Sequence, residues 1–185
     1  FKIYKKYINH NLSGLEKKII IFNSSEQKKS INGYSNLIEK ILKLDPDRKT
    51  RIILIGGGVL GDLGGFISST ILRGIDLILV PTTLLSQVDS SIGGKNGINT
   101  KFGKNLIGTF YLPKFVIIDT FFLKSLNQRE IKSGYSEILK HSLIRNIKFF
   151  SWLNKYYKKI LLLKEPCISE AIFKSVKIKS GIVMN

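Results

Sequence analysis

The stretch Gly56-Gly57-Gly58-Val59-Leu60-Gly61-Asp62, which directly follows Arg51-Ile52-Ile53-Leu54-Ile55, decides the fold of this protein. The β-branched and aliphatic run predicts a buried strand that ends in a sharp glycine turn. After the turn, apolar residues recur at helical spacing from Val59 to Arg73, which predicts a helix. Such a turn brings backbone N–H groups and the positive end of a helix to one point, and this suits an anion such as a pyrophosphate.

The spacing Gly56-x-Gly58-x-x-Gly61 also matches the dinucleotide-binding fingerprint. A strand–helix corner that needs glycine only for tight packing would show the same letters. An ordinary Rossmann site further needs an acidic residue at the far end of the next strand. The one candidate, Asp76, stands at the beginning of the predicted strand Ile75–Val80. The sequence therefore predicts a nucleotide site whose layout differs from the ordinary Rossmann one.

Strands and helices alternate through the first part of the chain, which favours an α/β layer with parallel strands. The other predicted strands are Lys17–Asn23 and Lys114–Asp119, and Ser30 or Asn32 caps a helix that runs to about Leu44. Thr82-Thr83 follows the strand Ile75–Val80 and can cap a further helix. Because ligands bind beyond the carboxyl ends of parallel strands, we expect the glycine turn and Thr82-Thr83 to face one crevice.

From about Ser125 onward the pattern is helical only, with predicted helices over Asn127–Asn146, Ile147–Leu163 and Glu165–Met184. We therefore expect an α/β domain over residues 1–125 and the start of a helical domain over residues 126–185. The chain begins with Phe1 and ends at Asn185 inside a helical pattern, so we expect it to be incomplete.

The composition limits the classes of partner. The 30 Lys and Arg residues against 13 Asp and Glu give a formal net charge of +17, which would suit nucleic acid or an acidic metabolite. The lysines are spread along a chain that is rich in Lys, Ile and Asn, and this favours a compositional origin of the charge. The single cysteine, Cys167, excludes an internal disulfide framework and fits a reducing cytoplasm. We expect neither a signal peptide nor a membrane span.

Two further polar segments could carry chemistry. Asp89–Asn99 combines an acid, hydroxyls, glycines and Lys95, and Gly103-Lys104-Asn105 repeats the pairing of glycine with lysine. These lysines either bind phosphate or carboxylate or are solvated surface residues. Glu137, Lys140 and His141 share one helix face. They form either a surface ion pair or a metal carboxylate beside a substrate-binding lysine.

Together these motifs resemble the 3-dehydroquinate synthase family, from about Lys17 to the end of the chain. The matching segments are Glu26-Gln27-x-Lys29-Ser30, Gly56 to Leu63, Arg73-Gly74, Val80 to Leu85, Gln87 to Ser91, Gly93-Gly94-Lys95, Gly103-Lys104-Asn105 and Glu137-x-x-Lys140. The resemblance implies a Rossmann-like NAD-binding domain followed by an all-helical domain that binds a divalent metal, zinc or cobalt, and substrate. It also implies a cytoplasmic homodimer with no nucleic-acid or membrane partner.

The resemblance implies conversion of 3-deoxy-D-arabino-heptulosonate 7-phosphate to 3-dehydroquinate and phosphate, in the shikimate pathway. The steps are NAD-dependent oxidation, phosphate elimination, reduction by the same cofactor and aldol closure. It assigns metal binding to Glu137 and substrate binding or catalysis to Arg73, Asp89, Lys95, Asn105 and Lys140. It assigns the cofactor to Glu26, Lys29, Gly57, Gly58, Val59, Leu60, Gly61, Asp62, Thr82, Thr83, Lys95, Lys104, Phe122, Leu123, Lys124 and Ser125.

The chain also departs from the family pattern. The family completes its metal site with two histidines, which we expect beyond Asn185, and it also has a further catalytic lysine downstream. His141 lies one turn after Glu137 and could share a metal by geometry, but the family does not use that position. We therefore expect this chain alone to be inactive. Alternatives are another sugar-phosphate cyclase of the inosose or valiolone type, a metal-dependent alcohol dehydrogenase, a noncatalytic truncated binding protein and a basic nucleic-acid binder.

Overall fold

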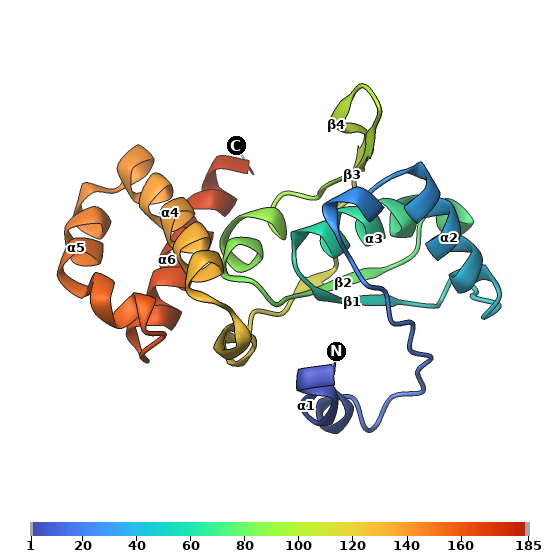
Figure 1. The fold of residues 1–185 in the computed structure, drawn as a ribbon, viewed down its shortest axis with the longest axis horizontal. Helices are drawn as coiled ribbons and strands as arrows, with labels where there is room; N and C mark the ends of the chain where they lie inside the picture. Colours follow the sequence, from blue (N-terminus) through green and yellow to red (C-terminus); the bar gives the residue numbers. More distant parts are fainter. Residues whose placement is uncertain (1, 184–185) are drawn as a thin grey trace.

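A computed structural model describes residues 2–183 of the chain, so the predicted helix end at Met184 and the chain end at Asn185 lie outside it. Its centre is a parallel sheet of the strands β1 (Ile52–Gly56), β2 (Leu77–Pro81) and β5 (Phe115–Val116), in that order. Ile52 pairs with Leu77, and Ile78 pairs with Phe115. The predicted parallel α/β layer is confirmed (Figure 1).

The glycine turn leads from β1 into α3 (Gly58–Thr70), which continues into the short helix η3 (Ile71–Arg73). Glycine lets α3 approach the sheet, because a Cβ atom on Gly64 would lie 2.5 Å from a side-chain carbon of Leu54. The helix α2 (Ile31–Leu42) begins where the sequence predicts, since the Ser30 hydroxyl accepts a hydrogen bond from the Gly33 N–H. One hydrophobic core unites these helices with the hairpin described next, and contains Leu37, Leu63, Ile67, Ile71, Ile75 and Ile98.

An antiparallel hairpin of β3 (Lys95–Thr100) and β4 (Gly103–Phe110) rises above α3 (Figure 1). The sequence does not predict it, because the segment is polar and glycine-rich and lacks an alternating apolar pattern. Glycine is needed where the two strands meet, since a Cβ atom on Gly108 would lie 2.0 Å from the Asn96 carbonyl oxygen. The hairpin packs closely on α3, since a Cβ atom on Gly65 would lie 1.9 Å from Asn96 Oδ1.

The prediction of a strand over Lys17–Asn23 is wrong. The segment has no regular secondary structure, although Ile20 and Phe22 pack on the core while Ile19 and Ile21 are exposed. Its alternating pattern is that of a strand, but a strand also needs a hydrogen-bonded neighbour, and no strand among residues 2–183 pairs with it. The helices η1 (Lys2–Tyr4) and α1 (Lys5–Asn11) precede it, and η2 (Glu26–Lys28) follows it.

After β2 the chain forms η4 (Ser86–Ser90), a π-helical turn, and after β5 it forms the short helix η5 (Thr120–Ser125). The predicted helices then follow as α4 (Gln128–Arg145), α5 (Ile147–Leu161) and α6 (Cys167–Val183). A capping box of Asn127 and Glu130 starts α4. None of the helices within residues 2–183 is long and apolar enough to cross a membrane.

The core of the helical part also includes Leu84, Val88 and Leu123 from the α/β part. Leu84 and Val88 are fully buried among Ile131, Ile138 and other residues of α4, α5 and α6. A Cβ atom on Gly134 of α4 would lie 2.5 Å from Leu84 Cγ, so glycine allows α4 to pack directly on this segment. The contact fixes α4 beside η4, and both elements carry predicted site residues.

Candidate active site

The glycine turn forms a cradle of backbone N–H groups at the carboxyl end of the sheet. Gly57 is the N-cap of α3, and no side chain caps the helix there. A Cβ atom on Gly57 would lie 3.1 Å from Thr83 Cγ2, and one on Gly58 would lie 2.9 Å from the Ser90 hydroxyl. The Thr82 N–H donates to the Gly56 carbonyl across the two strands. The glycine turn and Thr82-Thr83 are therefore neighbours, as the sequence predicts, while a crevice shared by them stays a prediction.

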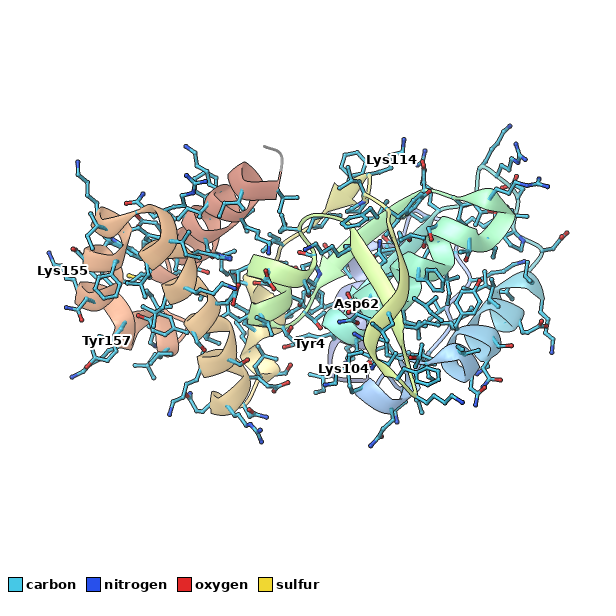
Figure 2. The ribbon with its side chains drawn as sticks, turned by 90° about the horizontal axis from the view of Figure 1, so that it is seen from above. Tyr4, Asp62, Lys104, Lys114, Lys155 and Tyr157 are labelled. Carbon is cyan, nitrogen blue, oxygen red and sulfur yellow. The ribbon has the colours of Figure 1, made fainter. Side chains whose placement is uncertain are left out.

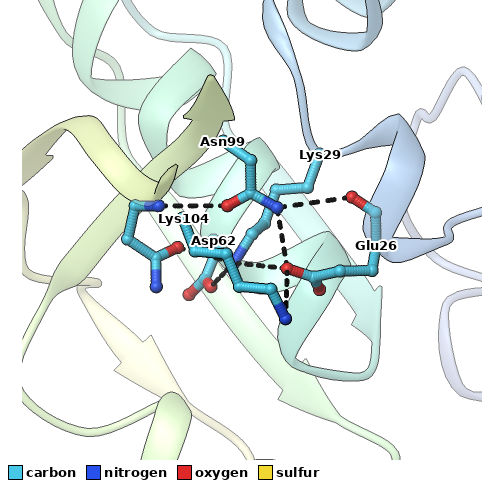
Figure 3. A network of polar contacts seen from close by, with 6 residues as sticks. Glu26, Lys29, Asp62, Asn99 and Lys104 are labelled. Carbon is cyan, nitrogen blue, oxygen red and sulfur yellow. Dashed lines mark hydrogen bonds and ion pairs between the residues drawn. The ribbon is translucent and has the colours of Figure 1, made fainter. Parts of the chain in front are cut away.

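Lys29 stands at the centre of a polar network beside this cradle (Figure 3). Its side chain is only 5% exposed, and its ammonium donates to Asp62 Oδ2 at 2.8 Å and to Asn105 Oδ1 at 2.7 Å. Burial raises the pKa of the Asp62 carboxyl, and the hydrogen bond and charge of Lys29 oppose that rise. Lys29 thus joins the start of α3 to the hairpin through bonds to protein groups.

The network continues along the hairpin. The Asn99 side chain donates to Glu26 Oε1 at 2.7 Å and accepts from the Asn105 N–H at 3.0 Å. The hydrogen bond from Asn99, followed by the nearby lysines, lowers the pKa of the Glu26 carboxyl. Asn105 has a φ of 57°, a left-handed conformation that asparagine tolerates better than most residues. Lys104 reaches Glu26 only at 4.0 Å and its side chain is 74% exposed, so it remains accessible to a ligand.

Two cavities adjoin the network. One, of about 890 Å³, is lined by Glu26, Ser30, Asn99 and Lys104 among others. The second, of about 490 Å³, lies between α3, η4 and the hairpin. It brings together four predicted residues and one unpredicted residue, namely Asp62, Asp89, Lys95, Asn105 and Lys179. Figure 2 shows Asp62 behind the hairpin strands and Lys104 beside them.

Glu137 forms a second polar cluster where α4 meets η4. Its Oε1 lies 2.5 Å from the Lys140 ammonium and 3.2 Å from His141 Nε2. One donor atom each from Asp89, Glu137 and His141 lies within 4.8 Å of the others. The hydrogen bond and charge of Glu137 raise the pKa of Lys140, whereas burial lowers that of His141. The predicted convergence of Glu137, Lys140 and His141 is confirmed, and Asp89 joins them.

Lys179 is the site residue that sequence reasoning missed. Its ammonium lies 2.6 Å from Asp89 Oδ1, and the lysine lines the cavity of about 490 Å³. A signal was present, because Ile168, Ile172, Ser175 and Lys179 follow one another at helical spacing on the buried face of α6. A lysine that continues a buried stripe needs a polar partner, and Asp89 provides it.

Other predicted residues lie outside the two cavities. Arg73 is exposed at the end of η3, with a φ of 66°. Leu123 is buried in the helical core and Phe122 is buried against Tyr4 and Tyr7, while Lys124 and Ser125 are exposed. Thr83 bonds with Ser86 at the start of the η4 segment. The structure therefore gathers Asp62, Asp89, Lys95 and Asn105, and leaves Arg73 apart from them.

Family models match the whole described site. The model of the 3-dehydroquinate synthase N-terminal domain matches residues 19–133, and that of the 3-dehydroquinate synthase C-terminal domain matches residues 134–185. This chain belongs to the 3-dehydroquinate synthase family. A 3-dehydroquinate synthase of Pelagibacter ubique is 51% identical to it over 98% of this chain and 50% of the relative. The chain spans about half the length of the curated relatives that it matches.

Solved structures of related cyclases share the fold of this family member. A 2-epi-5-epi-valiolone synthase from Streptomyces hygroscopicus, with NAD+ and Zn2+ bound, superposes with a TM-score of 0.90 at 25% identity, over 96% of this chain and 51% of the other. A 2-deoxy-scyllo-inosose synthase in complex with carbaglucose-6-phosphate, NAD+ and Co2+ gives a TM-score of 0.72 at 34% identity, over 76% of this chain and 39% of the other. The predicted Rossmann-like fold is confirmed.

Proposed function

We propose that this chain forms the cofactor- and substrate-binding half of a 3-dehydroquinate synthase. The whole enzyme would convert 3-deoxy-D-arabino-heptulosonate 7-phosphate to 3-dehydroquinate and phosphate. One observation carries the proposal: an uncapped glycine turn adjoins a cavity in which Asp89, Lys95, Asn105 and Lys179 meet. An anion cradle beside a set of cations and hydrogen-bonding groups suits a dinucleotide next to a phosphorylated acid.

The cradle fits NAD, which would accept a hydride from the carbon that bears a substrate hydroxyl and later return it. Side chains at Gly57 and Gly58 would fill the space against Thr83 and Ser90, so glycine keeps that space open. The backbone at the start of α3 would hold the pyrophosphate. Exposed Lys104 and half-exposed Glu26 line the larger cavity and would hold the adenosine end.

Glu137 fits a divalent metal, zinc or cobalt, which would lower the pKa of a coordinated substrate hydroxyl. Glu137 Oε1 and His141 Nε2 are buried and have no hydrogen-bond partner with good geometry. Carboxylate and imidazole donors suit both metals. Glu137 would hold the ion, with a carboxylate oxygen of Asp89 within 4.8 Å of its own donor atom.

The cations of the chain would bind the substrate anions. Lys95 is exposed in the cavity, and Lys140, which is 57% exposed, reaches toward the same region from α4. A dianionic phosphate and a carboxylate need several such groups. Lys179 and Asp89 would face the substrate as a pair, so that the carboxylate accepts from substrate hydroxyls while the ammonium stays neutralised.

We extend the proposal to the assembly. The division near residue 125, the cytoplasmic location and the homodimer remain predictions. Arg73 is exposed and lines neither cavity of its own chain, which is compatible with a role at a neighbouring subunit. The basic end of the molecule at α5, with Lys155 and Tyr157 pointing away from the site, has no part in the proposed chemistry (Figure 2).

Another sugar-phosphate cyclase is the second candidate, because the solved structures that share the fold include valiolone and inosose synthases. The substrate separates the two candidates. One preparation of the enzyme can be given heptulosonate 7-phosphate, glucose 6-phosphate and sedoheptulose 7-phosphate in turn, and the phosphate released from each can be compared. Activity on the heptulosonate acid alone would support the synthase, because only that substrate brings a carboxylate to the lysines.

The cofactor part of the proposal can be tested on this chain as it stands. We expect NAD+ to bind in a calorimetric titration, and Gly58→Val to weaken binding at least tenfold by filling the cradle. Gly14→Ala is the matched control, since nothing lies within 4 Å of a Cβ atom there and the turn is remote from the site. Equal NAD+ affinity in Gly58→Val and the native chain would contradict the proposed cradle.

The reaction itself can be tested by supplying the remaining half. The chain would be mixed with the C-terminal half of the Pelagibacter ubique relative, and phosphate release from the heptulosonate followed. We expect no release from either half alone and release from the mixture. Release by this chain alone would show that its own residues suffice and would contradict the expected inactivity.

A further inference from the structure

His141 and Ser175 form a buried pair behind the Glu137 carboxylate. His141 is 2% exposed and Ser175 is fully buried. The His141 Nδ1 atom lies 2.7 Å from the Ser175 hydroxyl, a contact that links α4 to α6. The opposite ring atom, Nε2, lies 3.2 Å from Glu137 Oε1, within ion-pair distance but without the angle of a good hydrogen bond.

The His141–Ser175 pair is better placed to orient Glu137 than Lys140 is. Glu137 and His141 stand one helical turn apart on α4, so the ring and the carboxylate share a face. The other group on Oε1, the Lys140 ammonium, sits on a side chain that is 57% exposed. An exposed lysine samples many rotamers, whereas a ring locked by Ser175 has one orientation.

We propose that His141 is a positioning residue that, held by Ser175, fixes the Glu137 carboxylate for metal binding. The Ser175 hydroxyl donates to Nδ1, so a proton sits on Nε2 and points at Glu137 Oε1. A small rotation of the carboxylate aligns this bond and leaves the other oxygen toward the cavity. The inference rests on the proposed function of Glu137, and it concerns the residues that hold this metal-binding carboxylate in place.

Direct coordination by His141 is the competing arrangement, and the charges disfavour it. Lys140 lies on Glu137 and Lys179 lies on Asp89 at 2.6 Å, so both carboxylates of a three-residue site already have ammonium partners. A metal held by Asp89, Glu137 and His141 together would displace both ammonium groups. If His141 instead donates a hydrogen bond to Glu137, neither ammonium group is displaced.

The tautomer of His141 tests the proposal without any metal. Long-range proton–nitrogen correlation spectra of the 15N-histidine-labelled chain would contain two rings, His10 and His141, and His141→Gln would assign them. We expect Nε2 of His141 to carry a proton, and Ser175→Ala to shift the Nδ1 resonance. Ser142→Ala is the control, because Ser142 is equally buried but donates to the Leu139 carbonyl. An unprotonated Nε2 would overturn the proposal.

Metal affinity tests the consequence. Co2+ would be titrated into the chain and followed by its visible absorption. We expect His141→Leu and Ser175→Ala to weaken binding by about 10-fold or more, the usual effect of losing such a partner. We expect His141→Gln, which keeps an N–H donor, to recover most of it. Unchanged affinity in His141→Leu would overturn the inference. If the native chain binds no Co2+, the metal site of the proposed function is contradicted. The tautomer of His141 still tests its hydrogen bond to Glu137.

Discussion

Around Lys29 the polar groups are joined by hydrogen bonds, whereas around Glu137 they meet mainly at ion-pair distance. The Lys29 ammonium bonds to Asp62 and Asn105, and Asn99 completes the network with Glu26. At the second cluster, Glu137 Oε1 and His141 Nε2 are buried without a well-oriented hydrogen bond. Buried polar groups in proteins are nearly always hydrogen-bonded, so a buried set held mainly by ion-pair contacts marks a place where a ligand is expected.

Lys29 and Lys104 belong to the same network but differ in their surroundings. The resemblance assigned Lys29 to the cofactor, but its ammonium is buried and already has two partners. Lys104, on the same network, is exposed, and its one ion-pair contact is at 4.0 Å. We infer that Lys29 mainly holds the hairpin on α3 and that Lys104 is the lysine free to meet a ligand.

Removing Lys29 should have the largest effect on stability. Lys29→Met leaves Asp62 half-buried without its cation, and we expect a loss of about 3 kcal/mol in the free energy of unfolding, measured in urea. Lys104→Met is the matched control and should change stability by less than about 0.5 kcal/mol, since exposed ion pairs contribute little. Similar losses in both variants would contradict the contrast between the two lysines.

The effect of Lys29→Met should also depend on pH. Burial already holds the pKa of Asp62 above its usual value, so the folded protein binds this proton more readily than the unfolded chain does. Ionised Asp62 therefore costs stability as the pH rises through its folded pKa. Without Lys29 that pKa rises further, so the deficit of the variant should shrink at acidic pH and grow toward neutral pH. Urea unfolding of both proteins across that range checks the sign.

The junction of the two parts should be the next most sensitive place. Gly134→Val puts atoms where Leu84 and the backbone of Leu85 stand, and overpacking of this kind costs about 1–3 kcal/mol. It should also push α4 away from η4 and so separate Glu137 from Asp89. We expect Co2+ affinity to fall while the Lys29 network keeps its contribution to stability. In a double variant with Lys29→Met, the two losses of stability should therefore be additive.

Lys179→Met should affect binding more than stability. Lys179 and Asp89 are partly exposed, so we expect a stability loss of about 1 kcal/mol or less. The affinity of the chain for the substrate should fall by more, because a cation that lines the cavity is lost. Lys177→Met on the same helix is the control. Unchanged substrate affinity would remove Lys179 from the proposed site.

The smallest effect is expected at Gly61, and it has the opposite sign. Nothing lies within 4 Å of a Cβ atom there, and the residue is inside α3, so Gly61→Ala should stabilise the protein by about 0.5–1 kcal/mol. If the pyrophosphate lies over the first turn of α3, the same methyl group should weaken NAD+ binding. Calorimetry and urea unfolding of this one variant would show whether position 61 requires glycine for ligand binding or for the fold.

The local elements were predictable because their signals are local. The apolar run before Gly56, the serine cap at Ser30 and the helical periodicity after Ser125 each depend on neighbours within a turn or a strand. Lys17–Asn23 failed for the opposite reason. Its alternation is real, but pairing depends on a second strand that the pattern itself does not contain.

The sequence by itself determined the α/β and helical parts, the glycine turn and, through its motifs, the family. Tertiary structure decided which charges are free. Only the fold places Lys29 between Asp62 and Asn105, 33 and 76 residues away, and Lys179 beside Asp89, 90 residues away. The pairing of a charge is a property of distance and burial, and a linear pattern shows neither for residues so far apart in the chain.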